Sequence, residues 1–512
     1  MLLSFVVLLI LSISSAVSAS ETHHISKRQT SNLNQVGGQG NSAVSQLNPG
    51  AGQNNPITGQ VNPGAGQNNP ITGQANPGTG QSNTVSVQVN PGQINPVQNP
   101  PVPTNNPSTN NVVQTNDKRI LAKLIGDFGL EMSDMIHQNG EQDTVVFSPL
   151  SIATLMTLLM AGMGQQSNSY FETLMLLGYD KACSPNPCDE TVIHQLYKDL
   201  LSDLTTQNNH VTFSMGNRLY LQSESSDKQN GLNIFGSYTK IAKEYYKAGT
   251  ETLDFFNDPF GAANRINKWV STATEGKIPQ LLTDPLSPQT KFMAVNTVYF
   301  KAPWLKPFVT DGTIVKKFDT GKGKIDMSFM TQIMGLKGDK IDELQATVIE
   351  LPYKGERYSM FIMKPEGPAS LNSVLQMETA LTPENINILI DRVKAKQPLP
   401  VSVQIPRMRL RYRAYLKEII GNLGATSMFS VVNADFSRLT SSNHTILDDM
   451  IHEAVMDITE EGTEAAAATS STSNRFGTNI AFSLDQPSLL FIHDSITKVP
   501  IFWARIVTPE SI

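Results

Sequence analysis

Apolar residues recur with helical spacing soon after residue 117, where the chain first takes on the composition of a globular protein. Between Lys118 and His137 they mark one face of a predicted amphipathic helix; they are Ile120, Leu121, Leu124, Ile125, Phe128, Leu130, Met132 and Ile136. Residues 148–162 open with Ser-Pro and continue almost entirely apolar, a pattern that predicts a buried helix. A shorter amphipathic helix is predicted over residues 264–274.

The later part of the chain favours strands. Segments rich in β-branched and aromatic residues lie at Phe292–Phe300, Thr347–Leu351, Tyr358–Met363, Val401–Val403 and Ile501–Val507. Helices that come mostly early and strands that come mostly late do not follow the alternation of a parallel βαβ sheet. We therefore predict an α+β fold, with one elaborate domain over residues 117–512.

The first 19 residues have the pattern of a secretory signal peptide. The apolar run from Leu2 to Ile13 is too short to span a membrane. Small residues follow it, and Val17 and Ala19 suit cleavage before Ser20. Because no other uninterrupted apolar run approaches 18 residues, we expect a secreted, extracellular protein that is soluble and has no membrane partner.

Residues 20–116 form a low-complexity extension. From residue 29 onward it contains no charged, histidine or aromatic residue. A repeat beginning NPG starts at Asn48, Asn62 and Asn76, a period of 14 residues. Such a sequence cannot bury enough apolar surface to offset its chain entropy, so we predict disorder. The extension is interpreted as a spacer, with a tether or a low-affinity docking region as the alternative.

Three short features indicate covalent processing of a secreted chain. Cys183 and Cys188, the only cysteines, are expected to form a local disulfide in an oxidising compartment. Asn443 begins an N-x-Thr sequence, which makes it a candidate glycosylation site on a surface loop. The dibasic pair Lys27-Arg28 is a candidate processing site, and the sequence leaves open whether it is cleaved.

Common catalytic motifs are absent from the sequence, including GxSxG, HExxH, the P-loop and GxGxxG. His452 lies in an apolar, strand-like context, which indicates a core histidine rather than a catalytic base. The scattered histidines and two cysteines do not support a metal site, and the net charge of −6 gives no reason to expect nucleic-acid binding. We therefore expect no catalytic residues, no metal and no cofactor.

Four arginines alternate with apolar residues in the segment RMRLRYR. They are Arg407, Arg409, Arg411 and Arg413. On a strand this spacing places four guanidinium groups on one face. The preferred interpretation is a solvated sheet face, and a polyanion-binding stripe is the alternative. The low overall basicity argues against a strong polyanion site.

Several motifs, in the expected order over residues 118–509, resemble those of the serpin family. They are Phe147–Ile152 (FSPLSI), Ile266–Ile278 (INKWVSTATEGKI), Asn296–Phe308 (NTVYFKAPWLKPF), Glu350–Tyr353 (ELPY), Ala434–Ser437 (ADFS) and Glu460–Thr469 (EEGTEAAAAT). The resemblance implies a monomeric protease inhibitor rather than an enzyme. It also implies a serpin fold, with about nine helices around three β-sheets and an exposed reactive loop at about residues 460–480.

The hinge of inhibitory serpins resembles a ten-letter segment of this chain. Its residues are Glu460, Glu461, Gly462, Thr463, Glu464, Ala465, Ala466, Ala467, Ala468 and Thr469. The resemblance implies that a protease cleaves the loop, which then inserts into a large sheet with the enzyme bound in a covalent 1:1 complex. Strand residues alternate between faces, so the inward side chains would be Thr463, Ala465, Ala467 and Thr469. All four are small and uncharged, which favours an inhibitor over the alternative, a non-inhibitory extracellular binding or storage protein.

Two adjacent bonds are candidates for cleavage. Arg475 is the only lysine or arginine in residues 460–496, and trypsin-like enzymes accept arginine in an acidic pocket, which favours Arg475–Phe476. Counting fifteen residues from the hinge glycine, as is usual in the family, gives Phe476–Gly477 and chymotrypsin-like targets. Asn474–Gly477 (NRFG) resembles the activation site of arthropod prophenoloxidases, which favours the first bond. The chain thus resembles insect haemolymph serpins that restrain clip-domain proteases of melanisation and innate immunity.

A last set of residues follows from family position alone. Polar side chains beneath the central sheet would be Ser148, Ser151, Asn296 and His452. The resemblance implies that these side chains control the opening of that sheet. We call these four the shutter residues.

Overall fold

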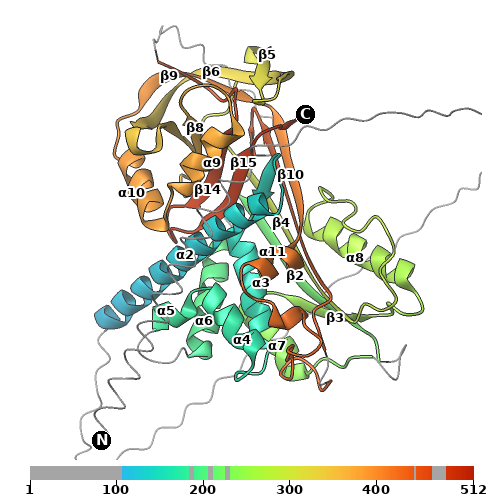
Figure 1. The fold of residues 1–512 in the computed structure, drawn as a ribbon. Helices are drawn as coiled ribbons and strands as arrows, with labels where there is room; N and C mark the ends of the chain where they lie inside the picture. The colour runs from blue at the N-terminus through green and yellow to red at the C-terminus, as the bar shows by residue number, and fades with distance from the viewer. Residues whose placement is uncertain (1–106, 184–188, 206–210, 225–230, 443–444, 464–479) are drawn as a thin grey trace, which may run out of the picture. The chain divides into compact units, whose positions relative to one another are not determined.

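The computed structural model describes residues 107–183, 189–205, 211–224, 231–442, 445–463 and 480–512 (Figure 1). All of them belong to one unit, Pro100–Ile512. The predicted signal peptide, the repeats and Asn443 lie outside the described residues. Cys188 and the side chain of Cys183 also lie outside them, so the disulfide stays a prediction.

The described part contains ten α-helices, against about nine predicted. They are α2 (Pro107–Gln138), α3 (Pro149–Ala161), α4 (Asn168–Leu176), α5 (Tyr179–Cys183), α6 (Glu190–Thr205), α7 (Gly236–Tyr246), α8 (Pro259–Ala273), α9 (Leu371–Thr379), α10 (Pro383–Lys394) and α11 (Leu416–Asn422). Three short 3-10 helices accompany them: η1 (Thr310–Gly312), η2 (Asp342–Leu344) and η3 (Ser427–Phe429). None of the described helices has both the length and the apolar character that crossing a membrane would require.

The first two helices form for reasons visible in the sequence. α2 buries most of the apolar face predicted for it, and it begins at Pro107, before the predicted domain boundary at residue 117. Ser148 caps α3 by accepting a hydrogen bond from Ser151 N at 3.2 Å, and Pro149 begins the helix. Every residue of α3 is buried, as expected for a helix that is apolar on all sides.

The central sheet has seven strands in the order β16-β10-β11-β12-β4-β2-β3. They are β2 (Thr212–Gln222), β3 (Gly249–Leu253), β4 (Phe292–Pro303), β10 (Met408–Tyr415), β11 (Asp449–Thr459), β12 (Gly462–Thr463) and β16 (Glu510–Ser511). β4 is antiparallel to β2, and β11 is antiparallel to β10. The two middle strands, β4 and β11, run parallel to each other.

The remaining strands form a nine-stranded system in the order β1-β15-β14-β8-β7-β6-β9-β13, with β5 paired to β6. They are β1 (Val145–Phe147), β5 (Ile314–Asp319), β6 (Lys324–Ile341), β7 (Ala346–Pro352), β8 (Tyr358–Pro365), β9 (Leu399–Pro406), β13 (Ala481–Ser483), β14 (Ser488–Asp494) and β15 (Pro500–Ile506). The long strand β6 pairs with β5 and β9 along its first part and with β7 along its last part. The second and third predicted sheets are therefore joined through β6.

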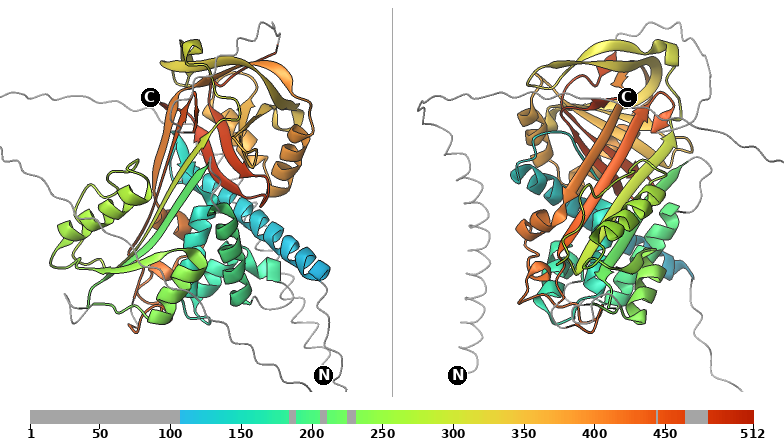
Figure 2. Two further views of the ribbon diagram at one scale, coloured as in Figure 1. Left: turned by 180° about the vertical axis from the view of Figure 1, so that it is seen from behind. Right: turned by 90° about the vertical axis from the view of Figure 1, so that its right-hand side faces the viewer.

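Both faces of the central sheet are covered (Figures 1 and 2). α8 lies across one face, where Ile266 and Val270 pack with Val295, Ile451 and Val455. α3 contacts β4 and β2 from the other side, and alternate sheet residues such as the alanines at 294 and 454 join its core. Because both faces are buried, any residue that enters this sheet must fit one of the two layers.

A buried ion pair joins α9 to the nine-stranded system. Arg505 on β15 is fully buried, and its Nε lies 3.2 Å from Oε2 of Glu378. Arg505 Nη2 donates to Ser133 O at 2.9 Å, and Trp503 Nε1 donates to Glu378 Oε1, also at 2.9 Å. These contacts connect α2, α9 and β15 through two buried charges.

We expect Arg505→Leu to destabilise the protein by about 3–5 kcal/mol, because Glu378 would keep a buried charge without its partner. The matched change Arg392→Leu breaks a pair in which the arginine is 41% exposed and its partner Asp339 keeps a second cation, Lys396, so it should cost less than about 1 kcal/mol. Thermal unfolding followed by circular dichroism compares the two variants with the parent. Equal losses in the two variants would show that the buried pair has no special weight.

Candidate functional site

The central sheet changes its pairing part-way along β4 and β11. Residues 449–455 of β11 pair directly with residues 293–299 of β4. Beyond this stretch β12 lies between the two strands, with Thr463 opposite Ile458 on one side and Ala302 on the other. The sheet is therefore closed over most of the length of β4, and in the described part of the chain it is parted by β12 at the end of β4.

Thr463 is the last described residue of the predicted hinge. Its side chain is fully buried, and its Oγ1 lies 2.6 Å from the hydroxyl oxygen of Tyr353. Tyr353 stacks on Trp304, with 4.6 Å between the ring centroids. Burial raises the pKa of Tyr353 far above its usual range, so its hydroxyl keeps its proton. One hydrogen bond and an aromatic pair therefore hold a small, uncharged side chain inside the sheet.

Gly462 allows the chain to pass close to β4. It is buried, and its φ is 153°. A Cβ at this position would collide with backbone atoms of Ala302 and Pro303. Glycine is the residue that accepts both this backbone conformation and this close approach. A side chain at position 462 would therefore push β12 away from β4.

Backbone hydrogen bonds fix the chain just before β12. Phe308 N donates to Glu460 O at 2.7 Å, and Trp304 N donates to Glu461 O at 2.9 Å. Trp304 also donates through Nε1 to Thr459 O at 3.0 Å. Trp304 therefore contacts the turn on both sides, through its backbone and through its ring.

The arginine row predicted from the sequence is paired with carboxylates. The pairs are Arg407 with Glu460 (3.3 Å), Arg409 with Asp457 (2.6 Å), and Arg411 and Arg413 with Glu453 (2.6 and 2.8 Å). Three of these arginines lie on β10, and all of the carboxylates lie on β11 or in the turn after it. This arrangement favours the interpretation as an ordinary sheet face, because each guanidinium group that a polyanion would need already forms an ion pair within the sheet, with Glu453 serving two of them.

The four shutter residues meet beneath the closed stretch of the sheet, and all four side chains are fully buried. Asn296 Nδ2 donates to Ser151 Oγ at 2.6 Å. Asn296 Oδ1 is hydrogen-bonded to Nδ1 of His452, which lies opposite it on β11. Ser148 enters through the cap of α3, where it bonds Ser151 N. This network ties β4, β11 and α3 together at the place where β4 and β11 pair directly.

The sequence did not predict two residues of the site: Asn217, which joins the shutter network, and Tyr353, which contacts the hinge. Asn217 on β2 lies opposite Asn296, and its Oδ1 accepts a hydrogen bond from Asn296 Nδ2 at 2.5 Å. A polar side chain inside a strand is a signal that could have revealed Asn217. Tyr353 and Trp304 both fall in motifs that resembled the family, but no local pattern shows that Tyr353 meets Thr463 or that the two rings stack.

The remaining predicted site residues lie outside the described residues. They are the hinge residues 464–469 and the two candidate bonds at 475–477. Described sequence resumes at residue 480, and β13 then pairs with β9. Within the described part, no group of three or more histidine, cysteine or acidic residues could hold a metal ion.

A family model for serpins, the serine protease inhibitors, matches residues 123–509. The chain belongs to the serpin family. Serpins are protease inhibitors and not enzymes. The sheet with a hinge between its middle strands is thus the central sheet of a serpin.

Named relatives support the same assignment. A serine protease inhibitor from Mus musculus is 31% identical over 401 residues, which cover 77% of this chain and 85% of that protein. The leukocyte elastase inhibitor of Xenopus tropicalis is 28% identical over 394 residues, covering 76% of this chain and 99% of the relative. Both alignments span nearly the whole serpin part of the chain.

Solved structures share the fold. Human thyroxine-binding globulin with bound thyroxine matches with a TM-score of 0.68 at 23% identity, covering 77% of this chain and all of that one. Uncleaved ovalbumin matches with a TM-score of 0.64 at 21% identity, covering 76% of this chain and 100% of its own. At these identities the likeness establishes the serpin fold alone.

Burial lowers the pKa of His452 to about 3, so its imidazole is neutral at physiological pH. The ordinary value in an unfolded chain is about 6.5. A folded pKa below the unfolded one means that the stabilising contribution is complete above about pH 6.5. It is lost as the pH falls towards the folded value, because only the unfolded chain takes up the proton readily.

Lowering the pH from about 7.5 to about 5 should therefore cost about 2 kcal/mol of stability through His452. His493, buried on β14 with its pKa also lowered to about 3, should add a similar loss. The variant His452→Gln, which keeps a hydrogen-bonding side chain beside Asn296, should lose about half of this pH dependence. Urea unfolding at both pH values measures it, and an unchanged pH dependence in the variant would contradict the assignment.

Proposed function

We propose that this serpin is a secreted suicide inhibitor of trypsin-like serine proteases, cleaved between Arg475 and Phe476. The observation that carries the proposal is the position of Gly462 and Thr463 between β4 and β11. A sheet that accepts the first hinge residues in this way has an entry path for the residues that follow. Insertion adds a strand to the sheet and carries the covalently attached protease with it.

The physical gain from insertion comes from the backbone. Each further residue that inserts breaks the direct hydrogen bonds between β4 and β11. The inserted strand then forms backbone hydrogen bonds to β4 on one side and to β11 on the other. The inward side chains expected after Thr463 are alanine at 465 and 467 and threonine at 469. They bury no charge and need little space, so insertion can outrun hydrolysis of the acyl-enzyme. The composition of the hinge therefore supports inhibition rather than simple cleavage.

Replacing Thr463 by glutamate should convert the inhibitor into a substrate. The new carboxylate would have to enter a fully buried position beside Tyr353, where its desolvation opposes insertion. We expect at least ten molecules of the variant to be consumed per protease inhibited, with cleaved chain in place of the SDS-stable complex on a gel.

The matched control for this variant is Glu464→Ala, at the neighbouring position whose side chain the strand alternation directs outward. It should inhibit with a stoichiometry close to that of the parent. Parental complex formation by Thr463→Glu would show that insertion does not pass through the observed position of β12.

Two candidate bonds remain within the proposal. Arg475 supports trypsin-like targets, because an acidic specificity pocket accepts arginine. The second candidate, Phe476–Gly477, is favoured by the count from Gly462, the residue that the structure shows at the entry to the sheet. It would direct the inhibitor to chymotrypsin-like proteases.

Arg475→Ala should abolish the SDS-stable complex with trypsin, and the adjacent control Phe476→Ala should retain it. Mass spectrometry of the C-terminal peptide released by trypsin should find Phe476 as its first residue. A peptide that begins at Gly477, together with a stable complex formed only by chymotrypsin, would replace the first bond with the second. Cleavage without any complex would instead indicate a non-inhibitory serpin.

A narrower proposal concerns the biological target. We propose clip-domain proteases of melanisation and innate immunity, acting in an extracellular fluid such as haemolymph. The support is the four-residue resemblance of Asn474–Gly477 to prophenoloxidase activation sites, together with the predicted signal peptide. Identification of the protease in covalent complexes isolated from that fluid tests this target, and a protease of another class would exclude it.

A further inference from the structure

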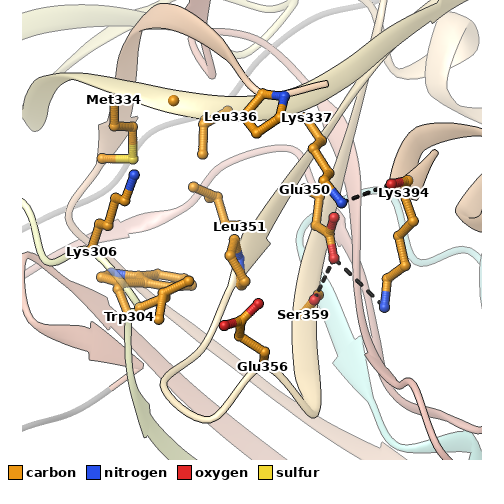
Figure 3. Close-up of a pocket in the computed structure, with 14 residues that line it drawn as sticks. Trp304, Lys306, Met334, Leu336, Lys337, Glu350, Leu351, Glu356, Ser359 and Lys394 are labelled. Carbon is orange, nitrogen blue, oxygen red and sulfur yellow. Dashed lines mark hydrogen bonds and ion pairs between the residues drawn. The ribbon is translucent and has the colours of Figure 1, made fainter. Parts of the chain in front are cut away.

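A cavity of about 290 Å³ lies beside the hinge, bounded by the end of β4 and by β6 and β7 (Figure 3). Its apolar wall consists of Trp304, Met334, Leu336 and Leu351, each at most 5% exposed. In Figure 3 these four side chains surround a common space. The volume is close to the lower end of the range found for small-molecule sites.

One end of the cavity carries buried and half-buried charges. The carboxylate of Glu350 is 8% exposed; it accepts a hydrogen bond from Ser359 Oγ at 2.7 Å and lies 3.6 Å from Lys394 Nζ. The ammonium group of Lys337 donates to the backbone oxygen of Lys394 at 2.7 Å. This end therefore holds two ammonium groups and one carboxylate, which pairs with Lys394; among the described residues no acidic side chain forms an ion pair with Lys337. This end has an excess of one positive charge.

The rim of the cavity is charged and exposed. Lys306 and Glu356 both line it, and Figure 3 shows them on opposite sides of the Trp304 ring. Their opposite charges balance, so they do not change the sign of the inner end. An anion that reaches Lys337 would supply the negative charge that this end lacks, whereas a cation would be repelled by two ammonium groups.

We propose that this cavity binds a small amphipathic monocarboxylate. The carboxylate would accept hydrogen bonds from the two free N–H donors of Lys337, and an alkyl or aryl body would lie against Trp304 and Leu351. An ammonium keeps three donors, and the bond to Lys394 O uses only one of them. Binding would complete the charge balance at the inner end and remove apolar surface of the ligand from water.

The cavity also contacts the hinge directly, and this second part of the proposal rests on the proposed inhibitory function. Trp304 forms part of the cavity wall, stacks on Tyr353, and bonds Thr459 O and Glu461 O around the turn. Tyr353 in turn holds Thr463 inside the sheet. A ligand packed on Trp304 would stabilise this arrangement, and by linkage it would oppose any movement of the hinge that inhibition requires.

Isothermal titration calorimetry of the full chain with octanoate tests the site. We expect one octanoate per chain, at least tenfold weaker binding to Lys337→Met, and no binding of octylammonium. The matched control Lys340→Met changes a lysine on the same strand whose partner Glu366 lies outside this cavity, and it should bind octanoate like the parent. Equal affinity in Lys337→Met and the parent, or no binding of octanoate at about 1 mM, would overturn the proposal.

A second variant protects the test from a folding defect. Met334→Phe adds bulk to the cavity without altering any charge, and thermal unfolding shows whether it is folded. Met334→Phe should bind octanoate at least tenfold more weakly than the parent, whereas Lys340→Met should bind it with the parent's affinity. Undiminished binding to a folded Met334→Phe would place octanoate elsewhere and overturn the site.

The link to the hinge has its own readout. Saturating octanoate should slow the inhibition of trypsin by the parent at least threefold and leave Lys337→Met unaffected. Octanoate that binds without changing the inhibition rate would overturn the coupling and leave the site in place. If no protease forms a complex, the proposed function fails, but the calorimetry still decides whether the cavity binds a carboxylate.

Discussion

The pairing of β4 with β11 is the interaction on which the behaviour of the molecule depends. These strands lie at the middle of the central sheet, and they are joined directly along residues 293–299 and 449–455. The same strands are separated by Gly462 and Thr463 a few residues further on. The sheet therefore shows two arrangements of the same strands, paired directly along one stretch and separated by β12 along the next. In the proposed mechanism, insertion moves the boundary between these two arrangements along β4 and β11.

The boundary is held from below by a polar network in an otherwise apolar interior. Asn296 and His452 lie opposite each other on the two strands and are hydrogen-bonded, and Ser151 connects them to α3. Parting the strands here would separate these buried partners as well as the backbone ladder, and unpaired buried polar groups are costly. The neutral state of His452 matters for the same reason, because a charge in this position would oppose the closed sheet.

The sequence predicts the individual helices and strands of this arrangement better than the contacts between them. The helices that became α2 and α3 and the strand that became β4 follow from periodicity and composition, because local pattern determines which faces are apolar. The small residues of the hinge indicate that it can enter a sheet, but composition does not show that Gly462 and Thr463 lie between β4 and β11. That depends on Gly462 passing close to Ala302 and on Tyr353 reaching Thr463, contacts between segments more than a hundred residues apart. The acidic partners of Arg407 to Arg413 could not be predicted either, because they depend on the pairing of β10 with β11.

The described part of the hinge lies between two segments of the chain that are held by backbone hydrogen bonds. Upstream, the turn is held by backbone bonds from Trp304 and Phe308 to residues 460 and 461. Downstream, β13 is paired with β9 from residue 481 onward. In the proposed mechanism, any residue after Thr463 that moves into the sheet shortens the stretch of intact chain that joins these two anchors. In the proposed mechanism, cleavage between the anchors removes this connection without changing the sheet, so that one broken bond frees the hinge to insert.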